Sequence, residues 1–212
     1  VHTASGYWVS TERETTIKGL FAAGDVAGGC PQKYVTGALA EGEIAAKSAL
    51  KYMNDSFFEI DGKEISKRKQ WLESFLNRLD SEFSTDELEG EMQTAMDEYA
   101  GGISSNYSFS EKSLGIADEK ILEIERKSEN LAAFDMMSLV YILELKERLT
   151  LCRSVIAHLA ARKETRWHIF AENSDYPECS EKWKLYVNSK MENGKLNIIL
   201  RPLVKEGEFY EH

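Results

Sequence analysis

The amino-acid sequence predicts an α+β protein in which a small strand–loop–helix unit is followed by a helical bundle and a terminal β-hairpin. The first 53 residues hold seven of the fourteen glycines and carry no net charge, so the whole net charge of −10 lies beyond them. Residues 63–162 contain no proline and few glycines, which is helical composition. After Trp183 the chain alternates in polarity around Asn193-Gly194, a dipeptide typical of hairpin turns.

These changes in composition divide the chain into three expected parts, residues 1–58, 59–182 and 183–212. In the first part, the apolar segments 6–9 and 19–23 are expected to be short strands. The second segment ends at Gly24, where a glycine-spaced turn begins. A helix is expected from about Gly37 to Met53, because apolar and small residues recur there at helical spacing.

The middle part predicts four helices. One covers about residues 63–79, and a second begins at the capping pair Ser84 and Glu87 and ends before Gly101. A short helix is expected near residues 118–127. The longest spans about 134–159, where one apolar stripe predicts a helix packed in the core. The stripe consists of Phe134, Met137, Tyr141, Leu145, Leu149, Cys152, Ile156 and Leu159.

Composition also excludes several classes of protein. Hydrophobic residues make up 42% of the chain, enough for a core, but no run of about 18 apolar residues is present to form a transmembrane segment. The negative net charge argues against nucleic-acid binding. The three cysteines are far apart, which supports neither a disulfide framework nor a metal site, and a reducing cytoplasm fits best. The first residues, Val-His-Thr, indicate a piece of a longer protein.

The densest group of residues suited to chemistry is the turn at Gly24 and Asp25. Nucleotide-binding α/β folds place a carboxylate at the end of an apolar strand, beside glycines, to accept hydrogen bonds from ribose or ribityl hydroxyls. Asp25 is the expected acceptor. The amino-terminal end of the helix near Gly37 would stabilise negative charge, including that of a reduced flavin. The alternative is an ordinary turn with a solvated aspartate.

Residues 19–25, Gly-Leu-Phe-Ala-Ala-Gly-Asp, and 41–46, Glu-Gly-Glu-Ile-Ala-Ala, resemble the second FAD-binding stretch of the fumarate reductase/succinate dehydrogenase flavoprotein family. His2, ahead of the 6–9 segment, matches a histidine at the substrate edge of the flavin. Residues 160–166 and 175–177, then Trp183, look like the family's ARxESR…DxP…W stretch. The resemblance implies FAD as cofactor, His2 as a catalytic residue, and cofactor contacts from Gly24, Asp25, Gly37, Ala38, Leu39 and Ala40.

One departure indicates a branch of that family. Residues 34–37, Tyr-Val-Thr-Gly, stand where the fumarate and succinate enzymes carry an Arg-Leu-Gly run for the dicarboxylate. The residues at 6–9, 24–25, 31–34, 37, 41–42 and 164–167 are instead similar to those of adenylylsulfate reductase alpha subunits. Those subunits use FAD to reduce adenylylsulfate to sulfite and AMP with electrons from an iron–sulfur subunit. This resemblance implies such a partner and a small anionic substrate, contacted by Lys33 and Arg166. Fumarate or succinate chemistry remains the enzymatic alternative.

Two further interpretations stay open. Arg162, Glu164 and Arg166 are also explained as a structural lattice of ion pairs. An acidic helix face would suit a module that only docks a basic partner, although such faces are usually solvated; its members are Glu119, Glu123, Glu125 and Glu129. No Gly-x-Gly-x-x-Gly motif is present, so the pyrophosphate-binding half of an FAD site is missing. We expect the chain to be a carboxyl-terminal part of a larger flavoprotein and to bind FAD weakly or not at all by itself.

Overall fold

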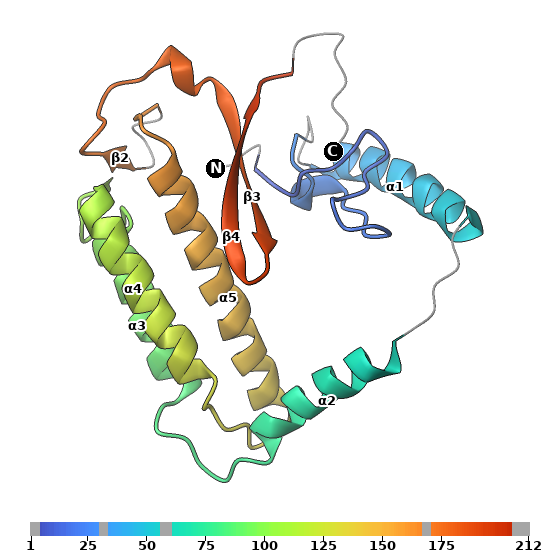
Figure 1. The fold of residues 1–212 in the computed structure, drawn as a ribbon, viewed down its shortest axis with the longest axis vertical. Helices are drawn as coiled ribbons and strands as arrows, with labels where there is room; N and C mark the ends of the chain where they lie inside the picture. Colours follow the sequence, from blue (N-terminus) through green and yellow to red (C-terminus); the bar gives the residue numbers. More distant parts are fainter. Residues whose placement is uncertain (1–4, 30–33, 56–60, 167–170, 205–212) are drawn as a thin grey trace. The chain divides into compact units, whose positions relative to one another are not determined.

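The computed structural model describes residues 5–29, 34–55, 61–166 and 171–204 (Figure 1). By its internal contacts the chain divides into two compact units, which we call the turn unit (Val1–Ile60 with Val204–His212) and the helical unit (Asp61–Leu203). The described residues form five α-helices and two small sheets, which confirms the predicted α+β class.

In the turn unit, the two segments expected to be strands make isolated bridges only, so the expectation of continuous strands was wrong. Tyr7 pairs with Ala27 in parallel, and Glu14 pairs with Phe21 in antiparallel fashion. The Tyr7 amide donates to the Val26 carbonyl at 2.7 Å, and the Gly28 amide donates to the Tyr7 carbonyl at 2.8 Å. A continuous strand needs a neighbour along its whole length. In these two segments, only single residues have a bridge partner.

Two glycines let backbone segments of the turn unit approach each other closely. A side chain at Gly6 would lie 2.6 Å from the backbone nitrogen of Gly28, a distance that real side chains do not reach. Gly24 has φ +73 and opens the short 3-10 helix η1 (Gly24–Val26). A Cβ on Gly24 would lie 3.2 Å from the Cβ of Ala38, so the turn packs against the start of helix α1 (Val35–Asp55).

Helix α1 presents three different faces. Glu41 is buried and Tyr52 is half-buried on the face that packs within the unit. Glu43 and Lys47 form an exposed ion pair at 2.5 Å on another side. The third face carries exposed apolar side chains, which we call the α1 stripe. Its members are Val35, Leu39, Ala46, Leu50 and Met53, at helical spacing.

The helical unit contains α2 (Gly62–Leu76), α3 (Thr85–Tyr99), α4 (Glu111–Ser128) and α5 (Met136–Ala161). Helices α3, α4 and α5 lie side by side, and α2 contacts α5 (Figure 1). Their apolar faces meet in one core. Its largest fully buried apolar side chains are Phe75, Leu88, Ile121, Leu131, Ile142, Leu145 and Leu149.

Two helices of the helical unit begin directly after side chains that cap their first turns. The predicted capping box at Ser84 and Glu87 is confirmed: the Glu87 amide donates to the Ser84 hydroxyl at 3.2 Å, and the Ser84 amide donates to the Glu87 carboxylate at 2.7 Å. Helix α4 begins at Glu111 rather than near residue 118, so the expected short helix was too short. Ser110 and Ser113 cap it reciprocally. This serine pair was not predicted from the sequence, because it lacks the usual glutamate at the third position.

The apolar stripe predicted on α5 is confirmed in its second half and wrong in its first half. Leu145, Leu149 and Ile156 are buried, whereas Tyr141 is 53% exposed. Phe134 and Met137 are also exposed, and the core positions of this half are instead Leu139 and Ile142. Apolar residues occur on nearly all sides of this half, so helical spacing fits two different stripes. Packing against neighbouring helices selects one of them.

The terminal hairpin is confirmed. Strands β3 (Leu185–Glu192) and β4 (Lys195–Pro202) are antiparallel, and Glu192 pairs with Lys195. Asn193 (φ 53) and Gly194 (φ 74) both have positive φ, as a tight two-residue turn requires. The hairpin packs along α5 in the helical unit (Figure 1). Ser189 of β3 forms a hydrogen bond of 2.9 Å between its Oγ and Nε2 of His158 on α5.

Because of this packing, we expect the stability of the chain to depend on the protonation of His158. Burial, and secondly the charge of Arg162, lower the pKa of His158 from its ordinary value of 6.5. The neutral ring is therefore favoured in the fold, so its contribution is complete above that value and is lost as the pH falls below it. Urea unfolding at pH values between about 7 and 5 should show this loss. His158→Gln should flatten the slope, and an unchanged slope would contradict the assignment.

Candidate functional site

The turn unit brings two groups of predicted cofactor residues together. The extended segment before the turn is anchored by a hydrogen bond of 3.0 Å from the Ala22 amide to the Arg13 carbonyl. The η1 turn then places Gly24 against Ala38 and leaves Asp25 exposed. The predicted carboxylate therefore lies next to the first turns of α1, where residues 37–40 are found.

Helix α1 begins at Val35, two residues before Gly37. The Ala38 amide is already used within the helix, because it donates to the Tyr34 carbonyl at 2.9 Å. Leu39 is 70% exposed on the α1 stripe, and Ala40 is exposed as well. The exposed side chains among the predicted contacts on α1 are apolar. The backbone amides at the start of α1 that make no hydrogen bond within the helix belong to residues before Ala38.

Two predicted site residues lie outside the described residues. These are His2, the expected catalytic residue, and Lys33, the expected substrate contact. Both roles stay predictions. Among the residues that the structure does describe, no group of three or more His, Cys, Asp or Glu side chains is placed to hold a metal ion. Cys152 and Cys179 are free thiols.

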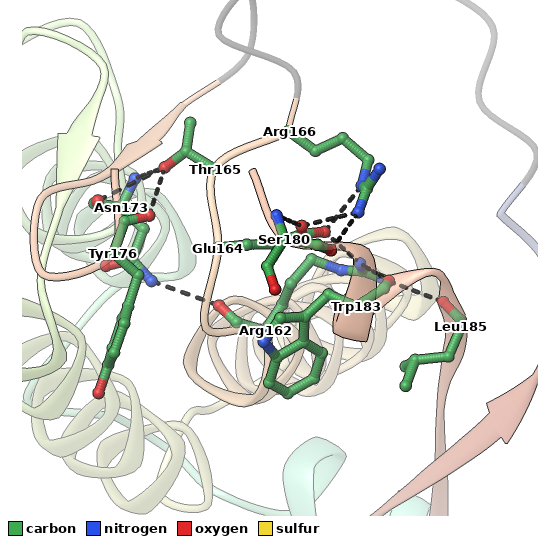
Figure 2. A network of polar contacts seen from close by, with 9 residues as sticks. All are labelled: Arg162, Glu164, Thr165, Arg166, Asn173, Tyr176, Ser180, Trp183 and Leu185. Carbon is green, nitrogen blue, oxygen red and sulfur yellow. Dashed lines mark hydrogen bonds and ion pairs between the residues drawn. The ribbon is translucent and has the colours of Figure 1, made fainter. Parts of the chain in front are cut away.

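In the helical unit, Arg166 belongs to a network of polar contacts around a buried carboxylate (Figure 2). The Glu164 side chain has no exposed surface. Arg162 donates to it from Nη1 at 2.8 Å, Arg166 donates from Nε and Nη2 at 2.8 Å each, and the Ser180 amide donates at 2.9 Å. We call these four residues the Glu164 network.

The network also ties down the segment that leads to the hairpin. Arg162 donates to the carbonyls of Trp183 at 2.8 Å and Leu185 at 3.0 Å, and Arg166 donates to the Ser180 carbonyl at 2.8 Å (Figure 2). These bonds are the structural lattice of ion pairs that the sequence offered as one interpretation. A further contact of Arg166 with a substrate stays a prediction.

Glu164 is held as a charged carboxylate. Burial by itself raises the pKa of Glu164, but the hydrogen bonds from Arg166, the Ser180 amide and Arg162 outweigh it and hold the pKa below the ordinary value of 4.5. One negative charge thus faces two guanidinium groups, of which Arg162 is 31% and Arg166 24% exposed. Removal of the carboxylate would leave two cations side by side.

Asp175 in the DxP stretch has a role that its sequence motif did not predict. Its Oδ2 accepts a hydrogen bond of 2.7 Å from the Glu111 amide at the first residue of α4, where a negative charge is favourable. Nearby, strand β1 (Ser108–Phe109) pairs in parallel with β2 (Glu172–Asn173). These partners are far apart in the sequence, so no local sequence pattern predicts their pairing. The motif therefore joins two distant segments of the chain.

Three of the four acidic residues that would suit a basic partner, on α4 or directly after it, pair with cations of the chain. Glu123 pairs with Lys127 at 3.6 Å, Glu125 pairs with Arg153 of α5 at 3.4 Å, and Glu129 pairs with Lys146 of α5. The two pairs to α5 link neighbouring helices. Cations of the same unit thus neutralise much of the negative charge on the face that would have suited a basic partner.

Comparison with known proteins finds similarity to part of an FAD-dependent oxidoreductase and part of an adenylylsulfate reductase. No family model matches it. It is 32% identical over 190 residues to an uncharacterized FAD-dependent oxidoreductase of Methanocaldococcus jannaschii, covering 86% of this chain and 33% of that protein. It is 28% identical over 199 residues to the adenylylsulfate reductase subunit alpha of Megalodesulfovibrio gigas, covering 86% of this chain and 30% of that protein.

Comparison with solved structures finds adenylylsulfate reductase again, together with quinol fumarate reductase. Adenylylsulfate reductase from the hyperthermophile Archaeoglobus fulgidus matches with a TM-score of 0.85 and 32% identity, covering 94% of this chain and 34% of that one. Quinol fumarate reductase of E. coli shares the fold, with a TM-score of 0.78 at 19% identity over 99% of this chain and 38% of that one. The chain is thus related to adenylylsulfate reductases and has the fold of fumarate reductase flavoproteins, as the resemblance implied. It spans about a third of their length.

The helices of the part of the chain that the structure describes include none that is both long enough and apolar enough to cross a membrane.

Proposed function

We propose that this chain is the carboxyl-terminal part of a flavoprotein subunit whose parent is an FAD-dependent adenylylsulfate reductase. The parent adds two electrons and two protons to adenylylsulfate, breaks the bond between sulfur and the bridging oxygen, and releases sulfite and AMP. The observation that carries this proposal is the Gly24–Asp25 turn packed on the start of α1, in a chain 32% identical to an adenylylsulfate reductase over 94% of its length.

The residues present fit one part of FAD. An exposed carboxylate on Asp25 suits the hydroxyls of the ribityl chain, and the exposed apolar Leu39 suits a flavin ring. Asp25 would accept hydrogen bonds from the ribityl hydroxyls, and the amino-terminal turn of α1 would favour negative charge near the flavin. Bound FAD would supply the two electrons for the substrate. Gly24 and residues 37–40 form the surface for that contact.

The α1 stripe supports the view that the turn unit is part of a larger domain. Val35, Leu39 and Met53 are each 70% exposed or more in this chain. An exposed apolar face of this kind usually marks an interaction site. In the parent, the rest of the FAD-binding domain would cover the face next to the cofactor.

His2 is the proposed catalytic residue, and Lys33 and Arg166 are the proposed substrate contacts. A histidine near the flavin would hydrogen-bond an anionic substrate or move a proton, because its pKa is near neutrality. Lys33 offers a point charge for phosphate or sulfate, and Arg166 offers a guanidinium. By its resemblance to adenylylsulfate reductases, the parent would receive electrons from an iron–sulfur subunit and work in the cytoplasm.

The proposal is tested with the full-length flavoprotein carrying this chain, purified with its electron donor. We expect stoichiometric FAD and reduction of adenylylsulfate, measured as sulfite release, with no activity on fumarate. His2→Ala should reduce the rate by about a hundredfold, as expected for loss of a proton-transfer group. Activity on fumarate alone would support the dicarboxylate alternative. A parent without flavin would leave the chain as a docking module.

We expect the chain by itself to bind FAD weakly or not at all, since it lacks the pyrophosphate-binding motif. Gel filtration of the chain with excess FAD should give a colourless protein peak. A yellow peak with one flavin per chain would contradict this expectation, and the full-length protein serves as the positive control.

A further inference from the structure

A buried ion pair joins the two halves of the proposed cofactor surface. Nε of Arg13 lies 2.7 Å from Oε2 of Glu41, and the two side chains are 21% and 5% exposed. Neither of these two atoms hydrogen-bonds to another group among the described residues. At these two atoms each charge has the other as its partner, and burial without that partner would be unfavourable. Glu41 is the one buried carboxylate in the described part of the turn unit.

Arg13 is held firmly in its loop. Its φ of 68 is in the left-handed region, which is uncommon for a residue with a side chain. Its Nη1 donates to the Ser10 carbonyl at 3.1 Å and the Thr11 carbonyl at 3.2 Å. Its own carbonyl accepts from the Ala22 amide at 3.0 Å. Arg13 thus holds the segment that leads directly into the turn.

Glu41 holds the other half. It follows directly after residues 37–40 on α1, and the same helix touches the turn through Ala38 and Gly24. Glu41 lies in the 41–46 stretch that resembles the flavoprotein family, but the sequence by itself indicated no role for it. Arg13 was not singled out, because its partner is far away in the sequence.

We propose that the Arg13–Glu41 pair is the positioning element of the flavin contact. It sets the first turns of α1 against the Gly24–Asp25 turn and thereby determines how the cofactor is held, without touching the cofactor. The inference rests on the proposed function. A buried carboxylate without its cation would change place or draw in water, and α1 would shift relative to Asp25.

The test uses the full-length flavoprotein with Glu41→Gln, Arg13→Gln and Arg13→Lys. We expect Glu41→Gln and Arg13→Gln to weaken FAD binding by about tenfold or more, since small displacements in a preorganised site have large effects. The visible absorbance and circular dichroism of the bound flavin, and its reduction potential, should change too. Arg13→Lys, which keeps the charge, should recover part of the affinity. Glu43→Gln, in the exposed pair with Lys47 on the same helix, is the matched control and should behave as wild type.

The outcomes separate the two proposals. Wild-type protein that binds no FAD overturns the proposed function and this inference with it. Wild-type protein that binds FAD, with unchanged affinity, spectrum and potential in the Gln variants, overturns the positioning role alone. A lower melting temperature with an unchanged flavin spectrum and potential also overturns it, because the pair would then be merely structural. If Glu41→Gln does not fold, the same criteria apply to the two Arg13 variants.

Discussion

Glu164→Gln is expected to lower the free energy of unfolding of the chain by about 3 kcal/mol, the lower end of the range for removing one partner of a buried ion pair. The glutamine keeps the shape and one acceptor oxygen but removes the charge that compensates Arg162 and Arg166. The lower end is expected because both guanidinium groups are partly exposed, at 31% and 24%. Urea unfolding followed by far-UV circular dichroism measures the difference.

The matched control is Glu123→Gln, whose carboxylate is 61% exposed and pairs with Lys127 at 3.6 Å. A loss of about 0.5 kcal/mol or less is expected there. The contribution of Glu164 has a definite pH dependence, because its pKa is lowered in the fold. It is present above the ordinary value of 4.5 and is lost as the pH falls through the lower value. Equal losses in the two variants would contradict the role of the Glu164 network.

Ile142→Ala is expected to cost about 2–5 kcal/mol, because the side chain is fully buried and its removal leaves a cavity among the helices. Tyr141→Ala, one residue earlier, is expected to cost about 1 kcal/mol or less, since that side chain is 53% exposed. Both substitutions leave an alanine on the same helix, so helix propensity affects them similarly.

Urea unfolding of the two variants under the same condition tests which side of α5 is buried in the core. A larger loss for Tyr141→Ala than for Ile142→Ala would support the stripe expected from spacing and contradict the structure. Leu145→Ala serves as a positive control, because both the sequence and the structure bury Leu145. Its loss should fall in the same range as that of Ile142→Ala.

Elements were predictable where their signals are local. Ser84 and Glu87 cap a helix through atoms three residues apart, and Asn193-Gly194 turns a hairpin through its own backbone angles. The Gly24–Asp25 turn was likewise visible as a glycine beside a carboxylate at the end of an apolar segment. Capping and turn formation depend on neighbouring residues and are the same in any fold, so the local sequence is enough to predict them.

Features that join distant residues were not predictable. Asp175 bonds to the Glu111 amide, Arg13 pairs with Glu41, and β1 pairs with β2 without any local pattern. The face of α5 was ambiguous because apolar residues occur on nearly every side of its first half. For the candidate site, the motif indicated which residues to expect together, but their contact through Gly24 and Ala38 is a result of packing.

By itself, the sequence determined the α+β class, the approximate places of the helices and the hairpin, and the relation to flavoprotein oxidoreductases. Only the tertiary structure decided which side of α5 is buried, that Arg162 and Arg166 share one buried carboxylate, and that Arg13 is bound to α1. The reason is physical: capping, turn formation and helical spacing act between neighbours in the chain. Burial and charge compensation depend on residues that meet only after folding.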